Sequence, residues 1–301
     1  MNHIAICCTD GSDLSLEAIE AGLSLLDRAQ CDVRVVTVVP RTPADPEVPG
    51  LMPSGTFAPA NATVGRDLAD SREEALDNGL ATARAVAERF GVPADKAQVL
   101  AGEPGPTVVH HLEEVGASLV LVGTRRLGRG ARFMEGSVSD HLIRHSPCPV
   151  IVGGEDVAEA PEGPVVVCID KSERSVDAGG KVVPLLAEGL PVALATVVPV
   201  GITGVEDEGD EELVIRRREQ KASKILTAAA DTLDLPDAEL IDLVDDTAAH
   251  ALVALAKSRP VRMLVVGSRG RGGLVRAVLG STAEQLVREA PSLVCVMPSR
   301  H

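Results

Sequence analysis

Short apolar runs alternate along the chain with longer segments whose apolar residues recur at helical spacing. The runs have strand length and β-branched content, and they lie at 3–8, 32–39, 97–101, 118–122, 149–152, 165–169, 191–198, 238–243, 261–266 and 293–297. In the first half, helical patterns separate them at 13–29, 67–90, 104–115 and 137–145, and the second half repeats the alternation. Strands that alternate with helices predict a parallel sheet covered on both faces.

The chain repeats itself. A shift of 144 residues superposes Val122-Gly123 on Val266-Gly267 and Ser137 on Ser281, and a shift of 160 superposes the first strands of the two halves. A repeat of this length is a whole domain. We therefore expect two domains, 1–153 and 164–301, joined by an acidic linker at 154–163, each a doubly wound layer of five parallel strands. Prolines open the fifth strand, which suits the start of an edge strand.

A glycine-rich loop follows the fourth strand of each half and leads into a helix. In the second half the loop reads Gly267-Ser-Arg-Gly270, then nine residues, then Gly280-Ser281. Glycines let backbone N–H groups approach an anion closely, and a helix N-terminus adds unpaired donors and a positive dipole end. The pattern predicts a phosphate site in each half.

The first copy of the loop reads Gly123-Thr-Arg-Arg126 and ends at Gly136-Ser137, so an arginine stands where Gly270 stands in the second. If that backbone requires a positive φ, arginine costs on the order of 1 kcal/mol, and its side chain enters the phosphate path. Arginine could instead add a charge-assisted phosphate contact. We expect the first site to be the weaker one.

Composition limits the classes of partner and compartment. The formal net charge of −15 disfavours a sequence-independent nucleic-acid binder, since phosphate backbones would be repelled. No apolar run approaches membrane-spanning length, and the first residues read as a strand, so we expect a cytoplasmic protein. The six cysteines show no metal spacing, and disulfides are not expected in that compartment.

Three markers carry a family resemblance, and two of them occur in both halves. An Asp-x-Ser follows the first strand at Asp10 and Asp170, the glycine motif follows the fourth, and Pro147-Cys-Pro149 opens a final strand. The chain resembles the tandem universal stress proteins of bacteria, in their ATP-binding branch. The resemblance implies two Rossmann-like domains of the adenine nucleotide alpha hydrolase-like kind. It also implies that domains pair through their last strands, and in a tandem chain the two halves can form this pair with each other. Whether two chains also form a homodimer stays open.

The resemblance further implies that each half binds ATP, with any Mg²⁺ carried by the phosphates. Asp10 and Asp170 would lie at the adenosine end. The other implied contacts are Val38 and Val197 to adenine; Val122, Gly123, Val266 and Gly267 to ribose and phosphates; Arg125, Arg269 and Gly270 in the loops; and Gly136, Ser137, Val138, Ser139, Gly280, Ser281 and Thr282 to the terminal phosphates. The two aspartates could also cap the following helices, and the loop arginines could be solvated.

Several readings of function stay open. The P-loop string of dedicated ATPases is absent, so the leading hypothesis is an ATP-dependent regulator in a stress response, acting with an unknown protein partner. A slow ATPase or self-phosphorylating enzyme that uses Ser137 or Ser281 is an alternative, as is a partner-binding module with a degenerate pocket. The pair His141 and His145 has no third metal ligand nearby, and we expect His110 and His111 to be exposed on their helix.

Overall fold

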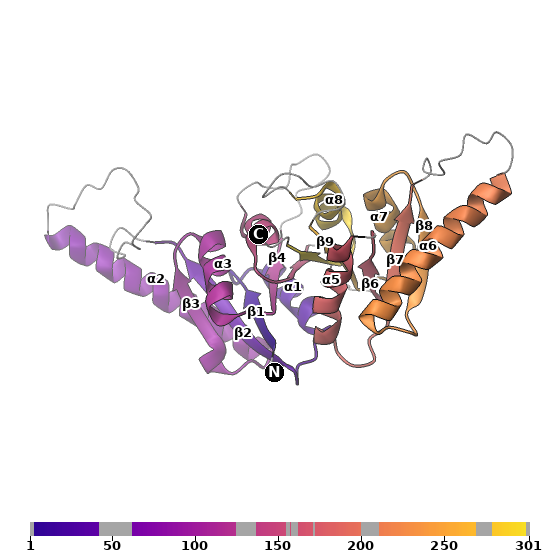
Figure 1. Ribbon diagram of the computed structural model, residues 1–301. Coiled ribbons are helices and arrows are strands. Elements are labelled where there is room, and N and C mark those ends of the chain that lie inside the picture. Colours follow the sequence, from indigo (N-terminus) through magenta and orange to yellow (C-terminus); the bar gives the residue numbers. More distant parts are fainter. Residues whose placement is uncertain are drawn as a thin grey trace.

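The computed structural model describes residues 3–41, 62–124, 137–154, 157, 162–170, 172–199, 211–268 and 279–298, without the side chains of 62–69 and 211–214. Within these ranges ten strands form one continuous sheet, in the order β3-β2-β1-β4-β5-β10-β9-β6-β7-β8 (Figure 1). All neighbouring strands are parallel except β5 and β10. The fold is therefore α/β, with a mostly parallel sheet flanked by helices.

In the part of the chain that the structure describes, each half contributes five strands and four α-helices in the same order. The first half holds β1 (His3–Cys8), α1 (Asp13–Leu23), β2 (Cys31–Val39), α2 (Ala62–Arg89), β3 (Ala97–Ala101), α3 (Pro104–Val115), β4 (Leu119–Gly123), α4 (Val138–His145) and β5 (Val150–Gly153). The second holds β6 (Val165–Cys168), α5 (Glu173–Val182), β7 (Val192–Val198), α6 (Glu211–Leu233), β8 (Glu239–Val244), α7 (Ala248–Ser258), β9 (Met263–Gly267), α8 (Ser281–Glu289) and β10 (Leu293–Met297).

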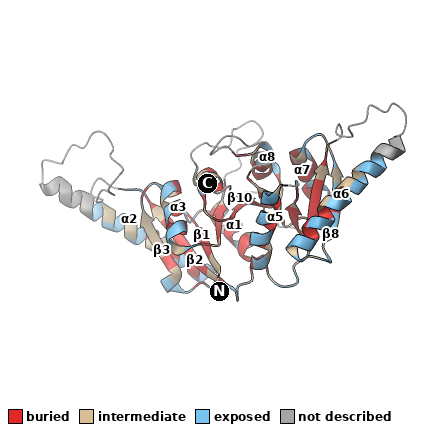
Figure 2. Ribbon diagram, viewed as in Figure 1, coloured by how far each residue is buried: buried red, intermediate tan, exposed pale blue. Residues whose placement is uncertain are grey.

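Two apolar clusters lie on the two faces of the sheet, and the strands between them are buried (Figure 2). Helices α1, α2, α5 and α6 contribute side chains to the cluster on one face, and α3, α4, α7 and α8 contribute to the cluster on the other. Aliphatic residues and alanine build both clusters, as a chain without tryptophan or tyrosine requires. The strands are buried on both faces because helices cover both.

Strands β5 and β10 join the two halves. They pair antiparallel, with Ile151 opposite Cys295 at the centre of the ladder. Since these two residues correspond under the 144-residue shift, each half presents the same position to the other. Within its own half β5 is an edge strand, as predicted, and β10 covers its outer edge, which confirms the implied pairing of the two halves through their last strands. Prolines are tolerated there because Pro147 and Pro149 precede the paired residues.

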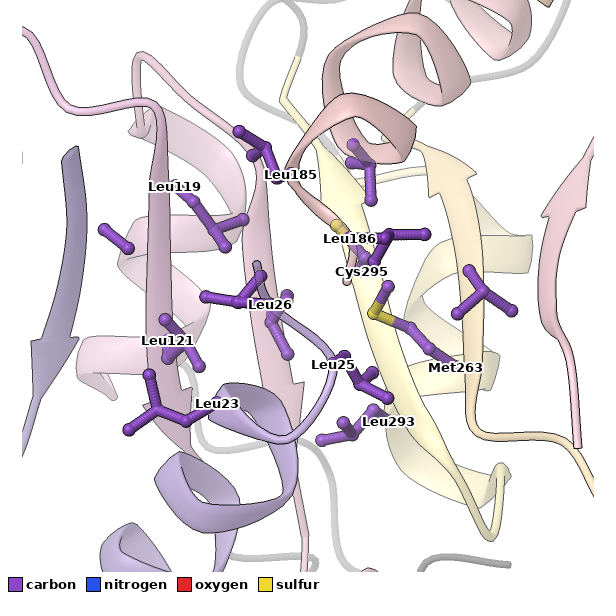
Figure 3. Close-up of a cluster of buried hydrophobic side chains, with 14 of the residues drawn as sticks. Leu23, Leu25, Leu26, Leu119, Leu121, Leu185, Leu186, Met263, Leu293 and Cys295 are labelled. Carbon is purple, nitrogen blue, oxygen red and sulfur yellow. The ribbon is translucent and has the colours of Figure 1, made fainter. Parts of the chain in front are cut away.

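A second junction lies on the face covered by α1 and α5. Leu26 forms an antiparallel bridge with Leu186, the Asp27 N–H donates to Leu185 O at 2.9 Å, and the Ala187 N–H donates to Leu25 O at 2.9 Å. The two hydrogen bonds are equivalent under the 160-residue shift. Leucines of both halves pack around this junction (Figure 3). The halves thus meet as the two subunits of an isologous dimer would, about a pseudo-two-fold axis.

This junction also explains why α1 is shorter than the predicted helix at 13–29. The helix ends at Leu23, and Leu25 and Leu26 leave it to pack between the halves. Apolar residues in this stretch follow the helical pattern by coincidence, because they serve a contact between the halves instead of one helix face.

Candidate functional site

A cleft of about 380 Å³ opens at the carboxyl ends of the first-half strands. It is lined by Cys8, Thr9, Asp10, Ser12, Leu14, Ser15, Val38, Pro104, Val122, Gly123, Thr124, Ser137, Val138 and Ser139. These residues come from the ends of β1, β2 and β4 and from the starts of α1, α3 and α4. Strand β1 lies between β2 and β4, and the helices that follow β1 and β3 pack on opposite faces of the sheet. The cleft therefore occupies the topological switch point, where open α/β sheets bind ligands.

One end of the cleft is acidic. The carboxylate of Asp10 accepts hydrogen bonds from the Ser12 Oγ at 2.6 Å and from the Ser12 N–H at 3.0 Å. Partial burial raises the pKa of the Asp10 carboxyl, but the hydrogen bonds from Ser12 and Ser15 outweigh it and hold that pKa below its usual value. Asp10 is thus ionised at neutral pH, and it repels phosphate while it can accept hydrogen bonds from hydroxyl groups.

The N-terminus of α4 also lines the cleft. The Ser137 Oγ caps this helix by accepting from the Asp140 N–H at 3.1 Å. Buried Ser139 donates to Thr124 Oγ1 at 3.1 Å, which ties the first turn of the helix to the end of β4. The remaining N–H groups of a first turn have no acceptor within their helix, and the helix dipole is positive there. This part of the cleft suits an anion.

Gly123 has a packing role that the sequence did not indicate. A Cβ at this position would lie 2.9 Å from Ser15 Cα and 3.1 Å from Leu14 O, closer than real contacts allow. The glycine lets the start of α1 lie directly against the end of β4. That close approach holds the acidic end and the helix end of the cleft together.

The second half carries a smaller cleft, of about 130 Å³, at the equivalent place. It is lined by Cys168, Ile169, Asp170, Ser175, Ala195, Val197, Ala248, Leu252, Val266, Gly267 and Thr282. The carboxylate of Asp170 accepts from the Ser172 N–H at 3.0 Å and from the Ser172 hydroxyl, as Asp10 does from Ser12. The acidic end is therefore conserved between the two clefts.

Substitutions between the halves account for the smaller volume and lower polarity of the second cleft. Ile169 replaces Thr9, Leu252 stands at the position of Val108, and Ala283 replaces Ser139. Gly280 caps α8 without a side-chain hydrogen bond, and its N–H donates to Ser268 O at 2.7 Å. The first cleft is thus wider and offers more hydroxyl groups, although the sequence favours the second as the stronger site.

Most predicted site residues that the structure describes line one of the two clefts. Those in the first are Asp10, Val38, Val122, Gly123, Ser137, Val138 and Ser139, and those in the second are Asp170, Val197, Val266, Gly267 and Thr282. Gly280 and Ser281 begin α8 without lining the cleft. Arg125, Arg126, Gly136, Arg269 and Gly270 lie outside the described residues.

Sequence reasoning missed the thiol at the floor of each cleft. Cys8 and Cys168 are equivalent under the 160-residue shift, and this match was the signal that could have found them. Burial, with a smaller effect of the neighbouring Asp10 or Asp170, raises the pKa of both thiols to about 12. They are neutral and serve as apolar floor, not as nucleophiles.

The prediction of an exposed histidine pair on α3 is half wrong. His110 is exposed beside Glu114, but His111 lies on the buried side of the helix, 8% exposed, because that face of α3 packs against the sheet. On α4, the rings of His141 and His145 stack with centroids 4.4 Å apart. No group of three metal-ligating side chains occurs among the described residues. Nor does any helix in the described ranges have the length and hydropathy needed to cross a membrane.

Known proteins share both the sequence pattern and the fold. Universal stress protein Rv2005c of Mycobacterium tuberculosis is 32% identical over 207 residues, which cover 65% of this chain and 66% of that protein. Universal stress protein Rv2623 of the same organism is 25% identical over 242 residues, covering 75% and 76%. The aligned part thus spans just under two thirds of the first of these relatives.

The fold matches solved structures of the same name. The structure of a universal stress protein from Archaeoglobus fulgidus aligns with a TM-score of 0.59 at 20% identity and covers 98% of both chains. The model of the Universal stress protein family matches residues 1–152 and again 163–298. The chain is therefore a member of the universal stress protein family, with two tandem copies of its domain.

Proposed function

We propose that the protein binds an adenine nucleotide, ATP first, in each of its two clefts and acts as a nucleotide-dependent regulator in a stress response. The observation that carries the proposal is the first cleft, where an ionised carboxylate and an open helix N-terminus face one cavity at the switch point of the sheet. Family membership supports the same reading.

The polarity of the cleft fixes the orientation of the nucleotide in this proposal. Asp10 repels phosphate and accepts hydrogen bonds from ribose hydroxyls. The half-buried end of β2 at Val38 offers apolar contact and backbone groups to the base. The phosphates then extend to the N-terminus of α4, where Ser137 and the first-turn N–H groups lie. The phosphates would bring any Mg²⁺ with them.

The ranking of the two clefts is a separate part of the proposal. The larger volume and the hydroxyl groups favour stronger nucleotide binding in the first cleft. In the loops, the second half has Gly270 where the first has Arg126, and this difference favours stronger binding in the second cleft. We propose that both bind and that the loop position modulates affinity. Arg126→Gly is then expected to strengthen the first site, and Gly270→Arg to weaken the second.

Calorimetric titration with ATP tests the proposal. The wild-type chain is expected to bind up to two nucleotides, and Val38→Trp and Val197→Trp are each expected to remove one site by filling one cleft. Circular dichroism verifies that the variants are folded. A folded wild-type chain that shows no saturable binding at millimolar ATP would refute nucleotide binding. Incubation with labelled ATP distinguishes a regulator from a slow ATPase or self-phosphorylating enzyme. Release of phosphate, or label on Ser137 or Ser281, would identify the protein as an enzyme.

A further inference from the structure

The two outer edges of the sheet differ, although the fold repeats. At one edge, α2 lies close over β3 because Gly79 has no side chain. A Cβ at this position would lie 2.7 Å from both Val99 Cγ2 and Val39 Cγ1. At the other edge, the shift of 143 residues that superposes Leu100 on Leu243 places the fully buried Ala222 of α6 at the position of Gly79, and α6 contacts β8 less extensively.

A groove of about 520 Å³ lies between α6 and β8. It is lined by Ile215, Arg218, Glu219, Ser223, Leu226, Leu240, Asp242 and Val244. Ile215, Leu240 and Val244 are 46%, 44% and 50% exposed, and they are the large apolar side chains that stand exposed in the described ranges. Three such side chains in one groove mark an interaction surface, where singly scattered ones would not.

Strand β8 closes the ten-strand order and, among the described residues, pairs on one side only. Its outer N–H and C=O groups can therefore accept another strand. Side chains alternate along a strand, so Leu240, Asp242 and Val244 face the groove together while Ile241 packs into the core. The edge thus offers backbone pairing and a short pattern of apolar, acidic and apolar positions.

The groove has acidic character at its centre. Burial, with a smaller effect of the Glu219 carboxylate, raises the pKa of Asp242 above its usual value. Arg218 also lines the groove, so two carboxylates face one cation. Glu239, at the start of β8, is already paired with Arg259 at 2.6 and 2.7 Å. A positive charge between Leu240 and Val244 would offset the electrostatic repulsion between the Asp242 and Glu219 carboxylates.

We propose that this groove binds an extended segment of a partner protein, which pairs with β8 as an added strand and places a lysine or arginine beside Asp242 between two aliphatic side chains. Strand addition supplies the main-chain hydrogen bonds, and alternate side chains give selectivity. A second copy of this chain fits less well, because pairing β8 with β8 would bring Glu239 and Asp242 of both copies together. The proposal goes beyond nucleotide binding and does not depend on it.

The test uses a fluorescein-labelled, end-blocked peptide, Thr-Val-Thr-Lys-Thr-Val-Thr, titrated with the full chain and followed by anisotropy. Saturable binding is expected, with slower hydrogen exchange of the β8 amides. Asp242→Lys is expected to weaken binding by about tenfold or more. Asp231→Lys, which makes the same charge change at an exposed site of α6 outside the groove, is expected to change it by less than about twofold.

Three results would overturn the proposal. The first is no saturable binding of the peptide by the folded wild-type chain. The second is an equal loss in both charge-reversal variants, which would mean that net charge alone attracts the peptide, or equal binding of the peptide with glutamate in place of lysine, which would mean that Asp242 does not select a cation. The third is self-association of the chain that Asp242→Lys alters in sedimentation, since a second copy would then occupy the groove.

Discussion

At the scale of single residues, the same position can serve packing and binding at once. Gly123 was predicted as a phosphate-loop glycine, yet its lack of a side chain is first required by the contact with Ser15 and Leu14. The glycine motif of the sequence therefore reports helix–strand packing as well as ligand approach. Its spacing remains informative, because both roles need the same close backbone contact.

Gly123→Ala is expected to destabilise the protein by about 1–3 kcal/mol, because a Cβ would overlap the backbone of α1. Chemical denaturation of the full chain measures the change. Gly180→Ala is the matched control: its Cβ would lie 3.7 Å from Leu233 Cδ2, within α5, so stability is expected to hold or rise by up to about 1 kcal/mol. Equal stability of the two variants would contradict the packing role of Gly123.

His111 makes the stability depend on pH. Burial, with smaller effects of Arg34 and His110, lowers its pKa from 6.5 against the opposing effect of Glu114. The unfolded chain then binds more protons than the folded chain as the pH falls below about 6.5, so the free energy of unfolding decreases on acidification.

His111→Leu is expected to remove that share of the pH dependence, while His110→Gln, at the exposed neighbour, keeps it. Urea unfolding at pH 7.5 and 5.5 compares the variants. Partial burial also lowers the pKa of His141, whose share stays the same in all three proteins. If His111→Leu loses as much stability as the wild type between the two pH values, the buried neutral histidine is not the cause.

At the scale of elements, the apolar pattern predicted every strand to within about two residues, because buried parallel strands are short, β-branched and flanked by turns. The pattern failed where apolar residues of one half pack against the other half and not within their own helix. Leu25 and Leu26 were predicted to extend α1, but they pack between the halves. This error arises at a contact between the halves, which a local pattern cannot reveal.

The candidate site was predictable for a related reason. Asp10 follows β1, Val38 lies at the end of β2 and Ser137 caps α4, and the parallel topology brings those ends to one edge of the sheet. What the sequence could not give is the difference between the clefts. This difference depends on the apolar residues Leu252 and Ile169, which line the second cleft. The sequence does not indicate that their side chains face a cavity.

The pairing of β5 with β10 makes a prediction at this scale. Ile151→Lys places a charge in a fully buried ladder opposite Cys295 and is expected to cost at least about 3 kcal/mol. Val244→Lys, on the exposed edge strand β8, is expected to cost less than about 1 kcal/mol. Thermal unfolding of both variants measures the two losses of stability. Similar losses would mean that β5 is not buried between β4 and β10.

At the scale of the whole molecule, the two halves share one sheet, and each of the two apolar clusters contains residues of both halves. Leu26 of one half and Leu186 of the other belong to the same cluster (Figure 3). We therefore expect the chain to unfold in one cooperative transition, with calorimetric and van't Hoff enthalpies that agree. Two separate transitions in the calorimeter would contradict a shared core.

The central claim is that nucleotide occupies the clefts at the two switch points, with its base at Val38 and Val197. Photolabelling with an azido-adenine analogue of ATP, followed by peptide mapping, tests the claim most directly. We predict label in the peptides that contain 31–41 and 192–199, and loss of that label when excess ATP competes. Label that ATP does not displace, or displaceable label confined to other peptides, would contradict the account.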